Sequence, residues 1–225
     1  MSPAETTVQR ARQSLGLSQE AIYRMVSDAI EEYGLTGGMV VDVGCGEGRL
    51  KRHLSKRFAR YVGVDVIRYD GFPETSEFLE TDLDTGRIPM PDGVADVAVS
   101  VETIEHVENP RGFVRELTRI VKPGGWVILT TPNQLSFLSL LTLLVRGQFG
   151  AFQSTDYPAH ITALLEVDLK RILDECGLAS CVTRYSGRGR MALTGRHYPS
   201  WMARLSARRF SDNLLVLGRR IPRHS

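Results

Sequence analysis

The chain has few cysteines and no apolar run long enough to cross a membrane. Its three cysteines, at positions 45, 176 and 181 of 225, are odd in number and unpatterned, which argues against a disulfide-built secreted domain and favours a reducing compartment. The longest apolar stretch, residues 135–145, is interrupted by hydroxyl side chains and is too short for a bilayer span. The N-terminus is polar up to Leu15 and lacks the basic-then-apolar pattern of a secretory signal. These absences predict a cytoplasmic protein with no transmembrane segment.

The most informative motif lies at residues 40–48, which read Val-Val-Asp-Val-Gly-Cys-Gly-Glu-Gly. β-Branched residues enter a turn with glycine at every second position, where a backbone without Cβ atoms can approach a ligand closely. The next predicted strand, residues 61–65, ends in Asp65, 21 residues after Gly44. At about this spacing a nucleotide-binding α/β unit places an acid on ribose hydroxyls. The motif therefore predicts a nucleotide-type cofactor.

Two classes of cofactor use such a unit, and the glycine pattern separates them. Dinucleotide-binding enzymes have G-x-G-x-x-G and direct a helix N-terminus at a pyrophosphate. Here the glycines follow G-x-G-x-G, and Asp42 stands two residues before the first of them. A carboxylate at that point would repel a pyrophosphate but suits a ligand that carries an ammonium group. S-adenosylmethionine (SAM) has an ammonium group and a ribose, and it has no phosphate.

The motif resembles motif I of the class I SAM-dependent methyltransferases, and the resemblance extends closely over residues 38–132. Asp65 matches the ribose-binding carboxylate of that family, and residues 80–83 match its third motif, which places an acid and an apolar backbone position on adenine. Residues 95–101 match the fourth strand, whose end faces the methionine part. The resemblance implies SAM as cofactor, with contacts from Asp42, Gly44, Gly46, Asp65, Asp82, Leu83 and Ser100.

The same resemblance implies an α/β fold, a doubly wound seven-stranded Rossmann-like sheet whose last strand is antiparallel. No internal repeat or low-complexity linker divides the chain, so residues 1–225 are expected to form a single methyltransferase domain. Within it we expect an N-terminal helical cap over residues 1–37 and a cofactor-binding core over residues 38–132. Residues 133–160 and 187–211 are expected to be insertions on the acceptor side, because connections at the carboxyl ends of strands build such sites.

Periodicity and capping signals predict the other elements. A helix over residues 18–33 is expected to pack across the cofactor side, and Leu50, Leu54 and Phe58 share one face of a helix after the glycine turn. Asn109 and Pro110 are expected to start a helix that stops at residues 122–125. The remaining predictions are a helix over 161–176 with Thr162 as its N-cap, and strands over 126–132, 180–186 and 213–218.

A second motif, Glu102-Thr-Ile-Glu105-His106, directly follows the fourth predicted strand. On a helical turn, positions 102, 105 and 106 share one face. This E-x-x-E-H pattern, with a later histidine before a helix, is similar to those of the metal-dependent small-RNA 2′-O-methyltransferases and the ubiquinone-pathway O-methyltransferases. The similarity implies Mg²⁺ or Mn²⁺ bound by Glu102, Glu105, His106 and His160, with His106 and His160 as catalytic residues. Two alternatives stay open: His106 acts as a metal-free base or orienting group, or it only completes the turn.

Charge is uneven along the chain. From residue 181 onward there are ten arginines and one acid, Asp212, whereas the rest of the chain is net acidic. A solvated basic surface is the simplest interpretation. The functional alternative is an electropositive wall that attracts an anionic acceptor, such as a nucleotide sugar, a phospholipid-linked intermediate or RNA. RNA is the weakest of these, because no aromatic-rich RNA-binding motif accompanies the arginines.

These observations predict a SAM-dependent methyltransferase that acts on oxygen. A hydroxyl is a poor nucleophile at neutral pH, so clustered carboxylates and imidazoles suit it better than an amine, which needs less activation. The expected acceptor is a hydroxyl on a sugar, polyol or phenolic small molecule, or on a glycan. The alternative acceptor is a ribose 2′-hydroxyl of RNA. An interpretation of another class is a SAM-binding partner subunit without catalytic activity, and the pattern is silent on oligomeric state.

Overall fold

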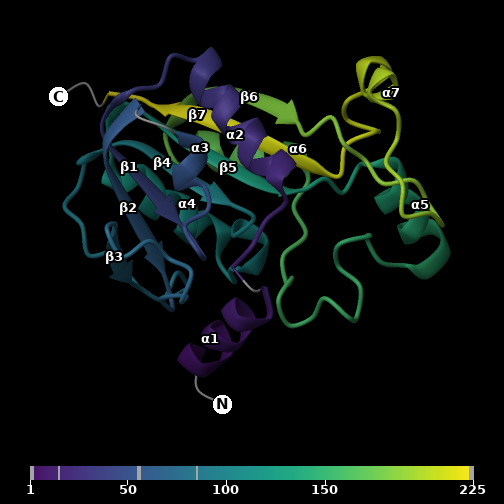
Figure 1. Ribbon diagram of the computed structural model, residues 1–225, viewed down its shortest axis with the longest axis horizontal. Coiled ribbons are helices and arrows are strands. Elements are labelled where there is room, and N and C mark those ends of the chain that lie inside the picture. The colour runs from purple at the N-terminus through teal and green to yellow at the C-terminus, as the bar shows by residue number, and fades with distance from the viewer. Residues whose placement is uncertain (1–2, 15, 55–56, 85, 223–225) are drawn as a thin grey trace.

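The computed structural model describes residues 3–14, 16–54, 57–84 and 86–222, with side chains from residue 7 onward (Figure 1). Its strands are β1 (Gly37–Val43), β2 (Phe58–Asp65), β3 (Glu77–Glu80), β4 (Ala95–Val101), β5 (Val121–Pro132), β6 (Leu178–Tyr185) and β7 (Asn213–Arg220). Its helices are α1 (Pro3–Ser14), α2 (Glu20–Glu32), α3 (Lys51–Leu54), the 3₁₀ turn η2 (Ile104–His106), α4 (Pro110–Ile120), α5 (Phe137–Arg146), α6 (Glu166–Glu175) and α7 (Ser200–Leu205).

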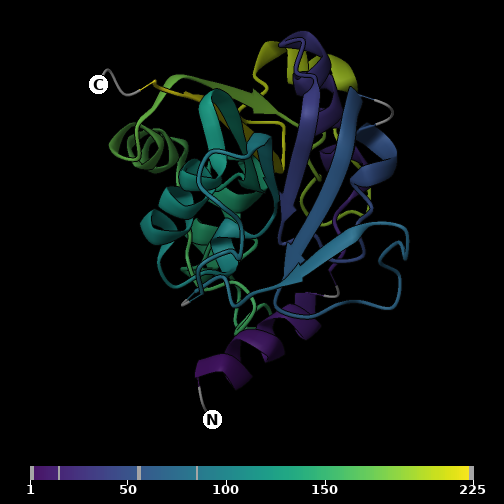
Figure 2. The same cartoon turned by 90° about the vertical axis from the view of Figure 1, so that its left-hand side faces the viewer.

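The strands form one sheet in the order β3-β2-β1-β4-β5-β7-β6. The pairs among β1 to β5 are parallel, whereas β7 runs antiparallel to both β5 and β6. The predicted doubly wound sheet with an antiparallel last strand is confirmed. The strand order reverses between β1 and β4, and Figure 2 shows their carboxyl ends directed toward α1. Such a switch point is where open α/β sheets bind ligands.

Helices cover both faces of the sheet (Figures 1 and 2). On one face α2 packs over alternate strand residues such as Val97 and Ile128, and on the other α4 and α6 pack over Ala98 and Val127. Because water reaches neither face, the central strands are nearly continuous apolar runs instead of alternating ones. This explains why their positions could be predicted closely.

The helix after the glycine turn is shorter than its pattern predicts. Helix α3 is a single turn, and Phe58 is not helical but begins β2, where it pairs with Gly37. Residues 55–56 of the predicted helix lie outside the described residues. Leu50, Leu54 and Phe58 do pack in the same apolar cluster, as their spacing suggested. Phe58 reaches this cluster from the first residue of β2 and not from a helix. The spacing therefore predicted the shared cluster correctly, but the predicted helix was wrong.

Two other boundaries differ from the predictions. Helix α4 is capped as predicted, since the Asn109 side chain accepts a hydrogen bond from the Gly112 amide at 2.9 Å. However, β5 begins at Val121, directly after the helix, and residues 122–125 shift its register against β4 within the strand. Helix α6 begins at Glu166, and Thr162 is not its N-cap, because the Thr162 hydroxyl donates to the Val107 carbonyl.

The predicted helix over residues 18–33 packs mainly on a face of the sheet, and only its beginning, through Tyr23, reaches the wall of the cavity on the cofactor side. It forms α2, which buries Ile22, Val26 and Ile30 against a face of the sheet. Helix α1 instead lies at the carboxyl ends of the strands, below the sheet in Figure 2. The apolar stripe of α2 requires a large apolar partner, and the sheet face offers one whereas a cofactor site does not.

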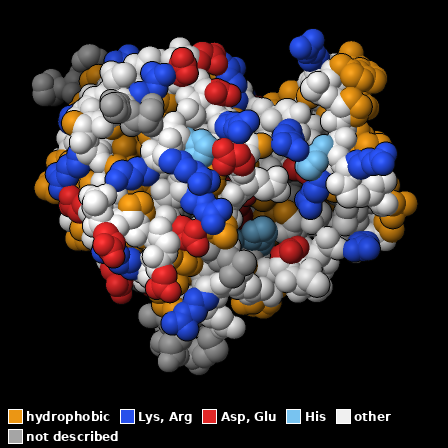
Figure 3. Space-filling model, in the orientation of Figure 1, with side chains coloured by type: hydrophobic (Ala, Val, Ile, Leu, Met, Phe, Trp, Pro, Cys, Tyr) orange, Lys and Arg blue, Asp and Glu red, His pale blue; other side chains and the backbone are white. Residues whose placement is uncertain are grey.

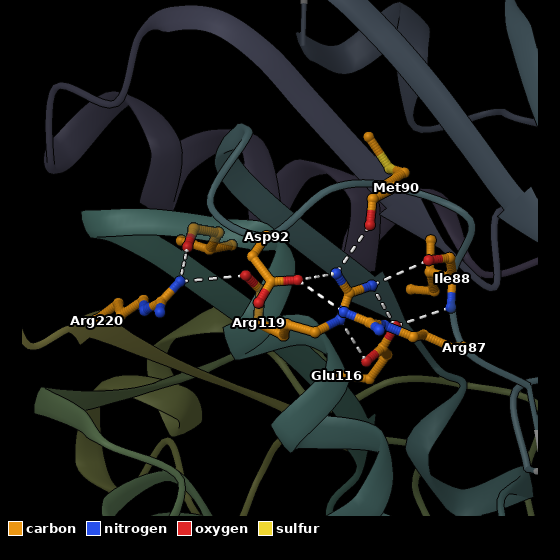
Figure 4. Close-up of polar contacts among 8 residues, drawn as sticks. Arg87, Ile88, Met90, Asp92, Glu116, Arg119 and Arg220 are labelled. Atoms are coloured by element: carbon orange, nitrogen blue, oxygen red, sulfur yellow. Dashed lines mark hydrogen bonds and ion pairs between the residues drawn. The ribbon is translucent and has the colours of Figure 1, made fainter.

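The connection from β3 to β4 is fastened to α4 by Arg119 (Figure 4). Its guanidinium donates to the carbonyls of Ile88 and Met90 at 2.9 and 2.8 Å, and it pairs with Asp92 and Glu116 at 2.7 and 2.6 Å. These hydrogen bonds satisfy backbone groups of a segment without regular structure. They fix the sheet end opposite the glycine turn and so contribute to the scaffold.

Residues 133–160 and 187–211 together form an insertion lobe that carries α5 and α7, at the right in Figure 1. The two segments pack on each other through Phe137, Tyr198 and Phe210, whose neighbouring ring centroids are 6.5 and 5.0 Å apart. The Phe137 amide also donates to the Arg209 carbonyl. In the described part of the chain, no helix combines the length and apolar character needed to span a bilayer.

Candidate functional site

A cavity of about 930 Å³, including its open mouth, lies at the carboxyl ends of β1, β2 and β4. Its wall includes residues from the glycine turn, from the strand ends, from η2 and from α1. Predicted site residues in this wall are Asp42, Gly44, Asp65, Leu83, Glu102, His106 and His160. The structure therefore brings together most of the positions that the two motifs singled out.

The glycine turn requires both of its first two glycines. Gly44 has φ +76°, and a Cβ atom built on it would lie 2.1 Å from Thr103 Oγ1. Gly46 has φ +51°, and its Cβ would lie 2.1 Å from the Gly16 carbonyl oxygen. The first glycine lets the turn approach the end of β4. The second admits the segment that joins α1 to α2, so the turn and the N-terminal region form one wall.

Asp65 holds the turn against the end of β2. Its Oδ2 accepts a hydrogen bond from the Gly46 amide at 2.8 Å, and its Oδ1 accepts one from the Val66 amide at 2.7 Å. The residue also lines the cavity. Burial raises the pKa of Asp65 to about 6. A hydroxyl group in the cavity could donate a hydrogen bond to this carboxylate and so stabilise its ionised form.

Asp42 is more deeply buried, with 2% of its surface exposed. The Tyr61 hydroxyl donates to its Oδ2. Burial raises the pKa of Asp42 to about 7, and the nearby Asp65 carboxylate raises it further against the lowering effect of that hydrogen bond. A cationic group in the cavity would favour the ionised form, as predicted for an ammonium-bearing ligand.

The raised pKa of Asp42 predicts an inverse dependence of stability on pH. The carboxyl ionises near pH 4 in the unfolded chain and near pH 7 in the folded one, so the free energy of unfolding should fall as pH rises between these values. Asp42→Asn removes the ionisation and should raise the unfolding free energy at pH 8 by about 2–4 kcal/mol relative to wild type. Urea unfolding at pH 5 and pH 8 measures this. Asp28→Asn, an exposed carboxylate on α2, is the control, and an unchanged pH slope in Asp42→Asn contradicts the prediction.

The residues predicted for adenine and for the methionine part lie near the cavity in different ways. Leu83 is in the wall, together with Asp84, which the sequence did not indicate. Asp82 Oδ1 accepts from the Asp84 amide at 3.0 Å and so shapes the turn that presents Leu83. Ser100 is buried in β4, and within the described residues its hydroxyl has no hydrogen-bond partner.

Glu105, His106 and His160 converge beside the cavity; the two histidines line it, and Glu105 is fully buried. One ligand atom from each lies within 4.8 Å of the others, and the two imidazole centroids are 4.8 Å apart. Nδ1 of His106 bonds to the Ala159 carbonyl at 2.7 Å, and Nδ1 of His160 bonds to the Ala151 carbonyl. Because a carbonyl oxygen can only accept, both rings carry a proton on Nδ1 in these bonds.

Burial governs the charge of this cluster. It lowers the pKa of His106 to about 4, helped by the neighbouring His160, so His106 is neutral at pH 7. It raises the pKa of Glu105 well above its ordinary value. Glu105 Oε2 accepts from the Thr131 hydroxyl at 3.1 Å, whereas Oε1 is buried and finds no partner within the described residues. A lone carboxylate oxygen beside two imidazoles is an arrangement that a cation would complete.

Glu102 lies in the cavity wall but is held away from this cluster by another bond. Its Oε1 accepts from the Asn213 side-chain amide at 2.6 Å. Its φ of +50° is unusual for a residue with a side chain, so the chain turns here before η2 begins. The helical spacing assumed for residues 102, 105 and 106 therefore holds only from Ile104 onward. Burial raises the pKa of Glu102 to about 7.

Arg10 on α1 is a site residue that sequence reasoning missed. It is 3% exposed, and its guanidinium donates to Asp84 at 2.6 Å, to Glu108 at 3.2 Å and to the His106 carbonyl at 3.1 Å. The Tyr69 hydroxyl also donates to the Ala11 carbonyl. These contacts fasten α1 over the cavity. No local signal indicates that an arginine in a polar helix is buried, because its partners are 74 to 98 positions away.

Comparison with known proteins yields a family match and structural neighbours. The family described as "Methyltransferase domain" matches residues 18–182. A SAM-dependent methyltransferase from Archaeoglobus fulgidus has a TM-score of 0.63 at 16% identity, over 88% of this chain and 94% of that one. A SAM-dependent methyltransferase from Mesorhizobium loti has a TM-score of 0.57 at 18% identity, over 86% and 96%. At these identities the two structures show a shared fold.

Two curated relatives carry names that specify an O-methyltransferase. "Ubiquinone biosynthesis O-methyltransferase, mitochondrial" from Dictyostelium discoideum is 32% identical over 133 residues, 51% of this chain and 41% of that protein. "Ubiquinone biosynthesis O-methyltransferase" from Chromobacterium violaceum is 28% identical over 172 residues, 73% and 70% of the two chains. The match thus spans less than half of the first relative's length and somewhat more than two thirds of the second's.

Proposed function

Because the chain belongs to the class I SAM-dependent methyltransferases, we propose that it transfers the SAM methyl group to a hydroxyl oxygen of a small molecule. The observation that carries this proposal is the convergence of Glu105, His106 and His160, of which the two histidines line the cavity. An oxygen acceptor must be deprotonated or polarised as it attacks, and these groups suit that task. The two relatives described above are named as O-methyltransferases, which supports the same assignment.

In this proposal the glycine turn and its neighbours hold SAM. Asp65 accepts from the ribose hydroxyls, Asp82 and Leu83 contact adenine, and Gly44 and Gly46 contact the methionine part. Asp42 faces the ammonium group, and Ser100, whose hydroxyl has no partner among the residues that the structure describes, lies beneath the methionine part. The cavity wall depends on both glycines, because a Cβ on Gly44 would clash with Thr103 and one on Gly46 with the Gly16 backbone.

The acidic and imidazole cluster also fits a divalent cation. The cluster offers two imidazoles and one buried carboxylate oxygen, and each imidazole donates its Nδ1–H to a backbone carbonyl, as metal-binding histidines usually do. We propose that Glu105, His106 and His160 bind Mg²⁺ or Mn²⁺, with Glu102 near enough to join only if it leaves Asn213. A bound cation would lower the pKa of the acceptor hydroxyl.

His106, His160 and helix α1 are proposed to have different roles in the reaction. The low pKa of His106 makes it a weak base, which favours a role as a neutral ligand over that of a proton acceptor. His160 is packed between His106 and Phe152, with ring centroids 4.8 and 5.4 Å away, so its Nε2 has a fixed position. Helix α1, held by the bond from Arg10 to the His106 carbonyl, forms part of the cavity wall and so limits the access of water. Orientation of the acceptor in line with the sulfonium then lowers the barrier, by up to about 7–11 kcal/mol in well-aligned systems.

A methyl-transfer screen tests this function. The protein, with labelled SAM and Mg²⁺ or Mn²⁺, is incubated with a catechol, a polyol, a nucleotide sugar and a short RNA, and the products are identified by mass spectrometry. We expect an O-methyl product from a phenolic or sugar hydroxyl. Methyl transfer to RNA ribose would support the alternative acceptor. The O-methyltransferase proposal is overturned if the methyl group is transferred to nitrogen or carbon. It is also overturned if the protein binds SAM but methylates none of these acceptors and nothing in fractionated lysate.

Loss of the Arg10 contacts is expected to weaken cofactor binding more than the fold. Arg10→Met leaves Asp84 without its partner, and α1 can then move away so that water reaches the carboxylate. The dissociation constant for SAM should rise about tenfold, the effect of losing about 1.4 kcal/mol of wall contacts, while the midpoint of thermal unfolding changes little. Calorimetry measures the affinity. Arg12→Met, an exposed position on the same helix, is the control, and equal effects from both variants would contradict the role of Arg10.

A further inference from the structure

The insertion lobe exposes more large apolar side chains than any other part of the described structure. On α5, Leu144 and Val145 are 84% and 74% exposed. On α7, Trp201 and Leu205 are 58% and 73% exposed, and their i, i+4 spacing places them on one helix face. Leu193 is fully exposed in the segment before α7. Single exposed apolar residues are common on protein surfaces, whereas a cluster of them marks an interaction surface.

The same lobe is strongly basic. Residues 133–160 and 187–211 together contain seven arginines and one acid, Asp156. Within the described part of the chain Arg188, Arg196 and Arg204 are exposed and have no acidic partner, whereas Arg190 pairs with Asp212 at 2.8 Å. Figure 3 shows blue and orange side chains together on the lobe at the right. Arg204 stands between Trp201 and Leu205 in α7, so charge and apolar surface coincide.

The combination fits an anionic lipid bilayer. Leucine, valine and tryptophan side chains insert at the boundary between headgroups and acyl chains, while arginines pair with lipid phosphates. RNA fits less well, because the four most exposed apolar side chains of the lobe, Leu144, Val145, Leu193 and Leu205, are aliphatic and offer no stacking face for bases. A second copy of the chain would bring like-charged lobes together, which is unfavourable. We propose that the insertion lobe docks the protein on an anionic membrane surface through α5 and α7.

The lobe is continuous with the cavity, so docking would place the site beside the bilayer. The Ala151 carbonyl accepts from His160 Nδ1, and Phe152 packs on the His160 ring. In the other segment, the Arg188 carbonyl accepts a hydrogen bond from the Asp212 amide. Asp212 directly precedes Asn213, whose side-chain amide donates to Glu102 in the cavity wall. An acceptor dissolved in the membrane could therefore reach the site along the lobe. The proposed docking itself does not depend on which acceptor is methylated.

Vesicle flotation with the full-length protein tests the proposal. Vesicles of phosphatidylcholine alone are compared with vesicles containing about one third phosphatidylglycerol, at low and high salt. We expect the protein to float with the anionic vesicles and not with the neutral ones. The double variant L144S/V145S should reduce the apparent partition coefficient at least tenfold. The triple variant R188Q/R196Q/R204Q should reduce it by about 100-fold at low salt, at about fivefold per arginine.

Matched variants outside the lobe provide the controls. Val167→Ser alters an apolar side chain that is 46% exposed on α6, and R24Q/R87Q/R171Q removes the same charge from the body of the protein. Both should float like wild type, and all variants should retain SAM binding. The proposal is overturned if wild type stays unbound with anionic vesicles or if L144S/V145S binds them unchanged. If the protein binds an RNA oligonucleotide through the arginines and without Leu144, the lobe is an RNA-binding surface instead. If the protein self-associates and L144S/V145S abolishes the association, the lobe is an interface between copies of the chain. No methyl acceptor is present, so failure here leaves the proposed O-methylation standing.

Discussion

Gly44→Ala is expected to abolish measurable SAM binding while leaving the protein folded. The added Cβ would lie 2.1 Å from Thr103 Oγ1 and 2.5 Å from its Cγ2. Thr103 is buried and its hydroxyl donates to the Val101 carbonyl, so it has little freedom to move aside. The turn must shift instead, and it would carry the cavity wall with it. We expect the dissociation constant for SAM to rise at least about 100-fold, as measured by calorimetry.

Gly177→Ala is a control that introduces the same backbone strain as Gly44→Ala without a steric clash. Gly177 has φ +80°, close to the +76° of Gly44, but a Cβ there would meet nothing within 4 Å. The variant should lose about 1 kcal/mol of stability and keep SAM binding, because only the left-handed conformation is penalised. Urea unfolding of both variants provides the comparison. Wild-type affinity in Gly44→Ala would place the cofactor away from the glycine turn.

The sequence was most informative where chemistry is local. Strands β4 and β7 were predicted nearly to their ends because both faces of the sheet are buried and each strand is a short apolar run. Asn109 caps α4 as predicted, since a cap depends on residues only three positions apart. The glycines at 44 and 46 have the positive φ values that their spacing suggested. These features depend little on distant parts of the chain.

Features that depend on distant residues could not be predicted in the same way. Helix α1 was expected only as part of a polar cap, and its burial of Arg10 depends on Asp84, 74 positions away. Thr162 has the composition of an N-cap, yet its hydroxyl is used by the Val107 carbonyl. Glu102 was predicted to share a helical face with Glu105, but its φ of +50° and its bond to Asn213 direct it elsewhere. In each case a tertiary contact outweighed a local preference.

Removal of divalent cations is the second large effect that we expect. Treatment with a chelator should abolish methyl transfer, and Mg²⁺ or Mn²⁺ should restore it, while SAM affinity stays within about twofold because the cluster lies apart from the glycine turn. His160→Ala should reduce kcat at least about 100-fold and remain inactive when cations are added. His197→Ala, an exposed histidine in the insertion lobe, should keep full activity.

Glu105→Gln distinguishes a cation site from a metal-free base. Glutamine keeps an oxygen for the Thr131 hydroxyl and removes a carboxyl whose pKa burial raises well above its ordinary value. Without cations the variant should therefore be at least as stable as wild type at pH 8. Mn²⁺ should raise the thermal midpoint of wild type but not of Glu105→Gln or His160→Ala, because a ligand stabilises only the state that binds it. If chelated wild type keeps full activity and Mn²⁺ shifts no midpoint, the cation is absent from the mechanism, and the lone pair of His160 Nε2 becomes the candidate proton acceptor.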